Sequence, residues 1–300
     1  MTLACLDPIS IRTTPISQAE MARIQRAFAD EGFVILKGVI PPAAVAGARE
    51  TMKRLSDERL ARFLVERKIT DLHADLPFEK RLIAVAQECA EAVPNFFREE
   101  LHVPGMHPFL LNPALVDIAE RFLGSEVRIY PNYMARPKLP DDQRMLICWH
   151  QDAAYTDNFK VTGAAATTDL RTVNLWSPLV PARRANGCMQ FIPASHKLGL
   201  VPYHQFQDIH LKIDDSALAP VLDHAVDIEL DPGDVVMFDN LLFHQGLPNT
   251  SDTIRWSVDW RFQDATQPTL RPQHGQLVRS ARDPGAAVRD AGDWGRRVFG

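Results

Sequence analysis

The chain has 300 residues, of which 46% are apolar, and its formal net charge at pH 7 is −5. This length allows one large hydrophobic core, and an acidic balance without a basic run argues against nucleic acid or an anionic membrane as the main partner. The sequence has no apolar stretch of membrane-spanning length and no secretory signal pattern. Its four scattered cysteines are typical of reduced residues in a cytoplasmic protein. We therefore expect one cytoplasmic domain over residues 1–300.

Helix signals dominate the first part of the chain, about residues 17–124. Ser17 and Glu20 form a capping-box pattern before a helix that is expected to end near Asp30. Three more helices are predicted. The first opens with the prolines at 41–42, the second spans 79–92 with apolar residues at helical spacing, and the third spans 112–124 after an asparagine cap followed by proline.

Strand patterns take over from about residue 127 to residue 263. Apolar runs of strand length alternate there with turn residues, and Asn186-Gly187 predicts a hairpin turn. The expected fold is mainly β, with helices flanking one face of a β-sandwich.

A His-x-Asp tripeptide, His150-Gln151-Asp152, is followed far downstream by His244. Two imidazoles and one carboxylate are the ligand set that holds non-haem Fe(II) on one face and leaves positions open for chemistry. His-x-acid also arises by chance, as it does in His73-Ala74-Asp75. That second tripeptide lies in a charged helix-and-turn stretch, so we do not expect it to bind metal.

The context of His150 differs, because it follows an apolar run over residues 145–149 that is typical of a buried strand. Residues i and i+2 of a strand point to the same face. His150 and Asp152 are therefore expected to reach one ion, while Gln151 points away.

His244 follows a second apolar segment, which begins with a predicted strand over residues 235–239. A lone histidine in that position is more often a core residue than a ligand. The next predicted strand, 254–262, changes this judgement, because alternation places Arg255 and Ser257 together on one face. A buried guanidinium needs an anion, and its planar fork suits a carboxylate. The pattern favours an iron oxygenase with a keto-acid co-substrate, and the alternative for Arg255 is an ordinary buried salt bridge.

The ordered motifs resemble the phytanoyl-CoA dioxygenase family of Fe(II)/2-oxoglutarate oxygenases over most of the chain. Ten residues separate His244 from Arg255, a spacing that also matches the family. The segments that carry the resemblance are GFVILKGV at 32–39, WHQD at 149–152, VNLWSPL at 173–179, NGCMQFIPASHK at 186–197 and PGD at 232–234. The resemblance implies a double-stranded β-helix, or jelly-roll, core.

The same resemblance assigns roles to individual residues. It implies His150, Asp152 and His244 as iron ligands and Arg255 as the group that binds the distal carboxylate of 2-oxoglutarate. It places Trp176, and more loosely Asn132, at positions of further co-substrate contacts. Gly246 stands where some members carry a co-substrate serine, and Ser257 is the candidate to replace it. The match is weaker around Arg136-Pro137-Lys138, which stands near the family's lysine-proline element.

The implied activity needs Fe(II), 2-oxoglutarate and O2, and it releases succinate and CO2. Hydroxylation of an unactivated C–H bond in a small molecule is the expected outcome, the substrate being a secondary metabolite, an amino acid or an acyl compound. Halogenating relatives have a small residue where this chain has Asp152, so oxygen transfer is favoured over halogenation. Candidate substrate contacts are Tyr155, Phe159 and Tyr133, each equally a candidate core residue.

Three alternatives stay open at this point. In the first, the reaction is desaturation or epoxidation. In the second, the substrate is a protein that binds in a wide groove. The third is a metal-binding cupin without redox chemistry, an isomerase or a binding protein, which would use the metal ligands but would not need Arg255 and Ser257. The connection from Ala153 to Asp169, rich in Ala, Thr and Gly, is interpreted either as a lid over the site or as a surface excursion.

Overall fold

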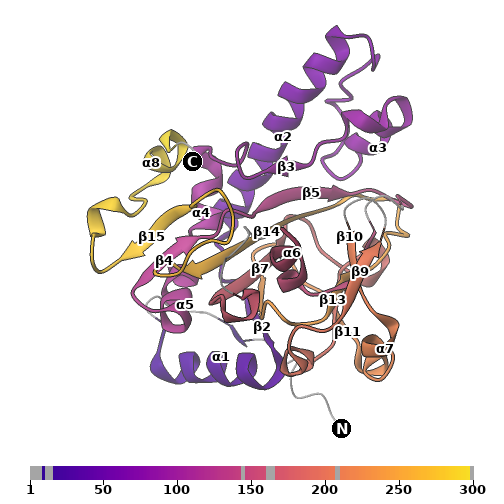
Figure 1. The fold of residues 1–300 in the computed structure, drawn as a ribbon. Helices are drawn as coiled ribbons and strands as arrows, with labels where there is room; N and C mark the ends of the chain where they lie inside the picture. The colour runs from indigo at the N-terminus through magenta and orange to yellow at the C-terminus, as the bar shows by residue number, and fades with distance from the viewer. Residues whose placement is uncertain (1–8, 11–15, 143–145, 160–165, 207–209, 298–300) are drawn as a thin grey trace.

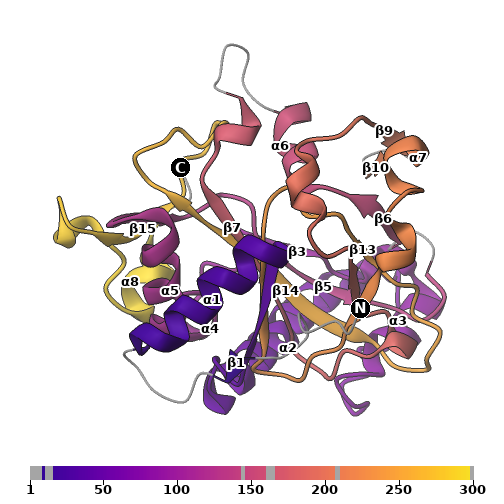
Figure 2. The same cartoon turned by 90° about the horizontal axis from the view of Figure 1, so that it is seen from below.

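Two β-sheets face each other, and helices cover the outer face of the larger sheet (Figures 1 and 2). This computed structural model describes residues 9–10, 16–142, 146–159, 166–206 and 210–297, with residues 158 and 159 described by their backbone alone. Within those ranges, no helix has both the length and the apolar character of a membrane span.

The larger sheet has nine strands among the described residues, and β5 and β3 join its main path through β14. The main path runs β1-β2-β12-β7-β14-β4-β15. Its pairs are antiparallel except that β1 runs parallel to β2. The strands are β1 (Ile9–Ser10), β2 (Phe33–Lys37), β3 (Phe96–Phe97), β4 (Glu126–Ile129), β5 (Met134–Lys138), β7 (Thr172–Pro178), β12 (Val235–Phe238), β14 (Arg255–Asp264) and β15 (Gln276–Ser280).

The smaller sheet has four strands in the described part of the chain, in the order β11-β8-β13-β6, and a separate hairpin is formed by β9 and β10. These strands are β6 (Ile147–His150), β8 (Met189–Phe191), β9 (Tyr203–Phe206), β10 (His210–Ile213), β11 (Val226–Ile228) and β13 (His244–Gly246). The two facing sheets with flanking helices confirm the predicted mainly β, jelly-roll architecture.

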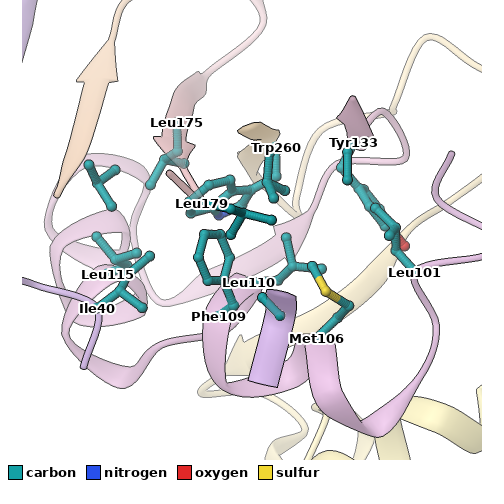
Figure 3. Packing of buried hydrophobic residues seen from close by; sticks show 14 of the residues in the cluster. Ile40, Leu101, Met106, Phe109, Leu110, Leu115, Tyr133, Leu175, Leu179 and Trp260 are labelled. Carbon is teal, nitrogen blue, oxygen red and sulfur yellow. The ribbon is translucent and has the colours of Figure 1, made fainter. Parts of the chain in front are cut away.

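Strand β12 is apolar on both faces because both of its faces are buried. In β12, Val235 and Met237 point into the core beneath the helices, whereas Val236 and Phe238 point into a second core between the sheets. Figure 3 shows part of the helix-side core, in which Trp260 of β14 packs against Phe109 with ring centroids 5.7 Å apart. Burial of such large aromatic surfaces contributes strongly to stability.

Two predicted helices, α1 and α5, begin at their capping residues, whereas α3 spans Arg81–Glu88 and is shorter than the predicted 79–92. Ser17 closes a capping box with Glu20, and the Asn112 side chain accepts a hydrogen bond from the Ala114 N–H. The helices are α1 (Gln18–Glu31), α2 (Pro42–Val65), α3 (Arg81–Glu88), α4 (His107–Leu110), α5 (Pro113–Leu123), α6 (Asp152–Phe159), α7 (Asp215–Leu218) and α8 (Ala291–Arg296). Short 3-10 turns lie at Ala90–Ala92, Pro104–Met106, Thr167–Asp169, Arg184–Asn186, Ser195–Leu198, Leu222–His224 and Pro284–Ala286.

Two local predictions were wrong. The β core is not confined to residues 127–263, because β2 pairs with β12 and β15 pairs with β4. Asn186-Gly187 is not a hairpin turn: β7 before it belongs to the larger sheet and β8 after it to the smaller one, so this segment crosses between sheets. In the connection from Ala153 to Asp169, which was interpreted as a lid or a surface excursion, residues up to Phe159 belong to α6. Residues 160–165 of that connection lie outside the described part of the chain.

Candidate metal and co-substrate site

The inner face of β14 is polar, although the strand runs through the centre of the larger sheet. Four alternate side chains of this strand line a cavity between the sheets: Arg255, Ser257, Asp259 and Arg261. The side chains between them join the helix-side core: Trp256, Val258 and Trp260. Buried charges are costly unless they are paired or bind a ligand, so this face indicates a functional site.

Two histidines meet at one edge of this cavity. His150 ends β6, His244 begins β13, and these two residues are direct partners in the antiparallel pair. The Asp152 Oδ1 atom lies 3.6 Å from His150 Nε2 and 3.8 Å from His244 Nε2. Within the described chain, these three residues are the set whose ligand atoms, all within 4.8 Å of one another, could hold a metal ion.

The two imidazoles are oriented by backbone carbonyls. His150 Nδ1 lies 2.8 Å from the Cys148 carbonyl oxygen, and His244 Nδ1 lies 2.9 Å from the Leu242 carbonyl oxygen. A proton on Nδ1 satisfies each contact and leaves the Nε2 lone pair toward the shared position, as in metal-binding histidines. Burial, reinforced by His150, lowers the pKa of His244 to about 3, so this ring is neutral at pH 7.

Asp152 reaches the same position by a route that differs from the prediction. It is the first residue of α6 and does not continue β6. The chain turns at Gln151, whose amide nitrogen donates to the Gly199 and Leu241 carbonyls at 2.8 and 2.7 Å. Gln151 does point away from the histidines, and its hydrogen bonds fix the turn that brings Asp152 back to them.

Arg261 holds the other oxygen of this carboxylate. Its Nη2 donates to Asp152 Oδ2 at 2.6 Å, and its Nη1 donates to Asp259 at 3.2 Å and to the Asn132 carbonyl at 2.9 Å. Burial alone would raise the pKa of Asp152, but Arg261 and the two histidines hold it well below its usual range. The carboxylate is therefore ionised, as a metal ligand must be.

The donor set fits a divalent iron centre. Two neutral imidazoles and one carboxylate are the facial ligands of non-haem Fe(II), and their positions on one side leave the cavity side for other ligands. The orientation of each donor by a neighbouring group is the arrangement that metal sites require.

Two basic side chains line the same cavity as this triad. Arg255 and Lys138 are direct partners in the β14–β5 pair, and both are buried. Among the described residues, no carboxylate forms an ion pair with either side chain. Burial, followed by the charges of Arg255 and Arg136, lowers the pKa of Lys138 to about 6. Burial, followed by Arg136, lowers the pKa of Arg255 to about 10.

The Arg255 guanidinium is held in a defined orientation. Its Nε donates to the Gly187 carbonyl at 3.1 Å, and its Nη1 donates to the Ser257 hydroxyl. The guanidinium carbon lies 5.2 Å from the centre of the Trp176 ring, a cation–π contact. A Cβ atom added at Gly246 would lie 3.1 Å from Lys138 Nζ, so the missing side chain leaves space for that ammonium.

The structure thus gathers most of the sequence-predicted site residues in one cavity. Its lining includes His150, Asp152, His244, Arg255, Ser257 and Trp176. Asn132 and Tyr155 instead line an adjoining cavity, which shares His150 and Asp152 with the first.

Of the two other predicted substrate contacts, Tyr133 lines neither of these cavities. Tyr133 belongs to the helix-side core, where its hydroxyl lies 2.5 Å from His102 Nε2 (Figure 3). The side chain of Phe159 lies outside the described residues. Tyr133 is therefore a core residue, which was the alternative to a substrate contact.

Sequence reasoning missed two residues of this site, Arg261 and Lys138. The signal for Arg261 was available: the alternation that pairs Arg255 with Ser257 continues to Asp259 and Arg261 on the same face. Lys138 was named only within the weaker match at Arg136-Pro137-Lys138 and received no role, because its position depends on the register between β5 and β14, which no local pattern defines.

Comparisons with known proteins identify the family of this chain. The model of the phytanoyl-CoA dioxygenase (PhyH) family matches residues 28–257. The chain is 29% identical over 169 residues to 1-deoxypentalenic acid 11-beta-hydroxylase of Streptomyces arenae, covering 52% of this chain and 56% of that protein. It is 30% identical over 136 residues to phytanoyl-CoA dioxygenase 1 of Oryza sativa subsp. japonica, covering 41% of this chain and 44% of that protein. The matches thus span about half the length of these curated relatives.

A solved structure shares the fold. EctD from S. alaskensis with 2-oxoglutarate and 5-hydroxyectoine superimposes with a TM-score of 0.57 at 21% identity, covering 90% of this chain and 85% of that one. At that identity the likeness concerns the arrangement of the sheets and helices.

Proposed function

The chain belongs to the phytanoyl-CoA dioxygenase family, and from this premise we propose that it is an Fe(II)- and 2-oxoglutarate-dependent dioxygenase that hydroxylates a C–H bond of a small molecule. One observation carries the proposal. Arg255 and Lys138, both buried and without a carboxylate partner among the described residues, line the cavity that ends at His150, Asp152 and His244. A dicarboxylate that binds a metal with one end and these cations with the other fits this arrangement.

When bound, Fe(II) with 2-oxoglutarate and O2 supplies the oxidising power for the reaction, with release of succinate and CO2. The residues of the chain hold and orient the reactants. His150, Asp152 and His244 hold the metal, Arg261 orients Asp152, and Arg255 with Lys138 binds the distal carboxylate. Trp176 and Ser257 keep the guanidinium in place, and the surrounding buried residues exclude water.

Asp152 also supports oxygen transfer over halogenation. Its carboxylate faces the two imidazoles, so it takes the coordination position that a halide would need, and its charge disfavours a nearby anion. Hydroxylation is the outcome that we propose, with desaturation or epoxidation as the variants that product analysis distinguishes.

The second candidate function is a metal-binding cupin-type isomerase or binding protein without redox chemistry. Such a protein needs the three metal ligands but gives no reason for two buried cations that lack partners. Those cations are the observation that favours the oxygenase.

Spectroscopy of the anaerobic protein tests the proposal. Addition of 2-oxoglutarate to the Fe(II)-loaded protein is expected to produce a weak visible charge-transfer band, and admission of O2 is expected to consume 2-oxoglutarate and form succinate. A protein that binds iron but shows neither result would be assigned to the cupin alternative. Mass spectrometry of the product then distinguishes a gain of oxygen from a loss of two hydrogens.

A further inference from the structure

A second cavity adjoins the metal triad, and the arginines in its wall outnumber the carboxylates. It encloses about 1000 Å³ of space, part of it open to solvent. Its wall includes His150 and Asp152, so it reaches the metal position from a side that Arg255 and Lys138 do not line. Four arginines and one further histidine border it: Arg98, Arg136, Arg261, Arg271 and His210.

The carboxylates of this cavity balance only part of that charge. Arg261 pairs with Asp152 at 2.6 Å and with Asp259 at 3.2 Å, and Arg136 pairs with the second oxygen of Asp259 at 3.0 Å. Two carboxylates are thus shared by two arginines. A bound metal ion would also neutralise the negative charge of Asp152.

Of the two remaining arginines, Arg98 pairs with Glu99 at 3.0 Å, which leaves the charge of Arg271. Within the described residues it forms no ion pair, and its buried Nε has no hydrogen-bond partner. Its guanidinium carbon lies 5.8 Å from the centre of the Tyr130 ring, which holds the side chain against the wall of the cavity. A buried donor without a partner is destabilising, so a cation in this state indicates a ligand.

The rest of the lining gives the cavity an apolar part. Phe97, Met134, Ile147 and Tyr155 contribute aromatic and aliphatic surface. Burial, followed by the nearby Arg136 and His150, lowers the pKa of His210, which favours a neutral ring that adds a polar contact.

We propose that the substrate is a small amphipathic acid, whose oxyanion is bound by Arg271 with help from Arg136 and whose apolar body lies against Tyr155 and Met134 beside the metal. The inference rests on the proposed oxygenase function and adds the substrate class. The anion is not the co-substrate, because 2-oxoglutarate has its own cations in Arg255 and Lys138. Arg271 therefore determines which compounds are oxidised and does not determine whether 2-oxoglutarate binds.

A library of matched pairs tests this inference while the substrate itself is unidentified. Each carboxylic acid, phosphate monoester or sulfonate is paired with its neutral amide, alcohol or sulfonamide and is added anaerobically to the Fe(II) protein with 2-oxoglutarate. Binding is measured from the shift of the visible charge-transfer band. Binders are expected among the anionic members, and the kind of oxyanion that binds tightest identifies the group.

Variants then connect the selectivity to Arg271. Arg271→Leu is expected to weaken the tightest anionic binder roughly 30-fold or more while 2-oxoglutarate affinity stays unchanged. Arg271→Lys should restore part of that affinity. Arg279→Leu is the control, because Arg279 pairs with Asp117 and Glu120 outside the cavity.

Three results would overturn the inference: neutral members that bind as tightly as their anionic partners, a library without any anionic binder, or wild-type affinity for the anion in Arg271→Leu. Failure of the proposed function is separable from each of these, because it appears as the absence of 2-oxoglutarate binding before any library compound is added.

Discussion

Arg261 donates a hydrogen bond from Nη2 to Asp152 Oδ2 at 2.6 Å, across 109 residues of sequence. The contact leaves Asp152 Oδ1 as the oxygen that faces the two imidazoles. Charge-assisted hydrogen bonds of this kind are strong and directional, and outer partners of metal ligands orient them. Arg261 is therefore a positioning residue for the metal centre.

The first prediction concerns metal affinity. Arg261→Met removes the donor and leaves Asp152 free to rotate, so the affinity for Mn(II), a redox-silent substitute for Fe(II), should fall by about 10–100-fold. Mn(II) binding is measured by electron paramagnetic resonance on protein whose fold has been checked by circular dichroism. Arg261→Lys keeps a cation and should recover part of the loss.

Arg171→Met provides the matched control for this loss. Arg171 Nη1 pairs with Asp264, also on β14, at 2.7 Å, and its side chain is largely exposed. Its removal should leave Mn(II) affinity at the wild-type value. Equal affinities in Arg261→Met and wild type would show that Asp152 needs no outer partner.

The second prediction concerns the co-substrate. Arg255→Ala should weaken 2-oxoglutarate by roughly 30-fold or more, because loss of one partner of a buried charge pair costs about 2–5 kcal/mol. Iron affinity should stay close to wild type, since Arg255 does not contact the metal ligands. Titration of the charge-transfer band with 2-oxoglutarate measures the first quantity.

Ser257→Ala tests the same site more gently. It removes the hydroxyl that accepts from Arg255 Nη1, a single hydrogen bond worth about 0.5–1.5 kcal/mol, or 1.5–3 kcal/mol with a charged partner. Its effect on 2-oxoglutarate should lie between wild type and Arg255→Ala. Wild-type affinity in Arg255→Ala would reassign the arginine to a structural role.

The third prediction follows from Lys138, whose pKa of about 6 leaves the amine mostly neutral at pH 8 in the empty site. A bound carboxylate favours the ammonium form and raises that pKa. Binding of 2-oxoglutarate therefore takes up close to one proton between about pH 6 and the higher pKa of the complex. By linkage, affinity falls in that window by up to about tenfold per pH unit as the pH rises.

Calorimetry in two buffers of different ionisation enthalpy measures this proton uptake directly. The uptake should vanish in Lys138→Met, and it should also vanish below about pH 6, where the lysine is already charged. Lys80→Met is the control, because Lys80 pairs with the exposed Asp252 at the surface. Affinity that is independent of pH in the wild type would contradict a role for Lys138 in co-substrate binding.

Much of this arrangement was predictable because it follows from short-range rules. The capping residues Ser17 and Asn112 define helix starts through contacts within one turn. The alternation in β14 puts Arg255 and Ser257 on the inner face because successive strand residues point to opposite sides. The apolar run of β12 is continuous because both of its faces are buried.

Contacts between distant segments were not predictable in the same way. Asp152 leaves the strand because Gln151 donates hydrogen bonds to the carbonyl oxygens of Gly199 and Leu241, and no local sequence pattern predicts those partners. The segment at Gly187 has the residues of a hairpin turn, but it connects β7 of the larger sheet to β8, which pairs within the smaller sheet. Register and sheet membership depend on the whole chain.

The last prediction concerns Gly187, whose backbone carries the carbonyl that accepts from Arg255 Nε. Its φ of 81° is in the left-handed region, which favours glycine. A Cβ atom there would lie 2.5 Å from the Leu247 carbonyl oxygen and 3.0 Å from Lys138 Cδ. Backbone oxygens do not yield easily, so Gly187→Ala should displace both Arg255 and Lys138.

Gly38→Ala separates this packing effect from backbone strain. Gly38 also has a positive φ, of 62°, but a Cβ atom added to it meets nothing within 4 Å. Both variants should lose about 1 kcal/mol of stability from the backbone alone. Only Gly187→Ala should lose more than that in a denaturant melt, together with affinity for 2-oxoglutarate. Parallel losses of stability with 2-oxoglutarate affinity intact in both variants would mean that the Arg255 orientation does not depend on the Gly187 carbonyl.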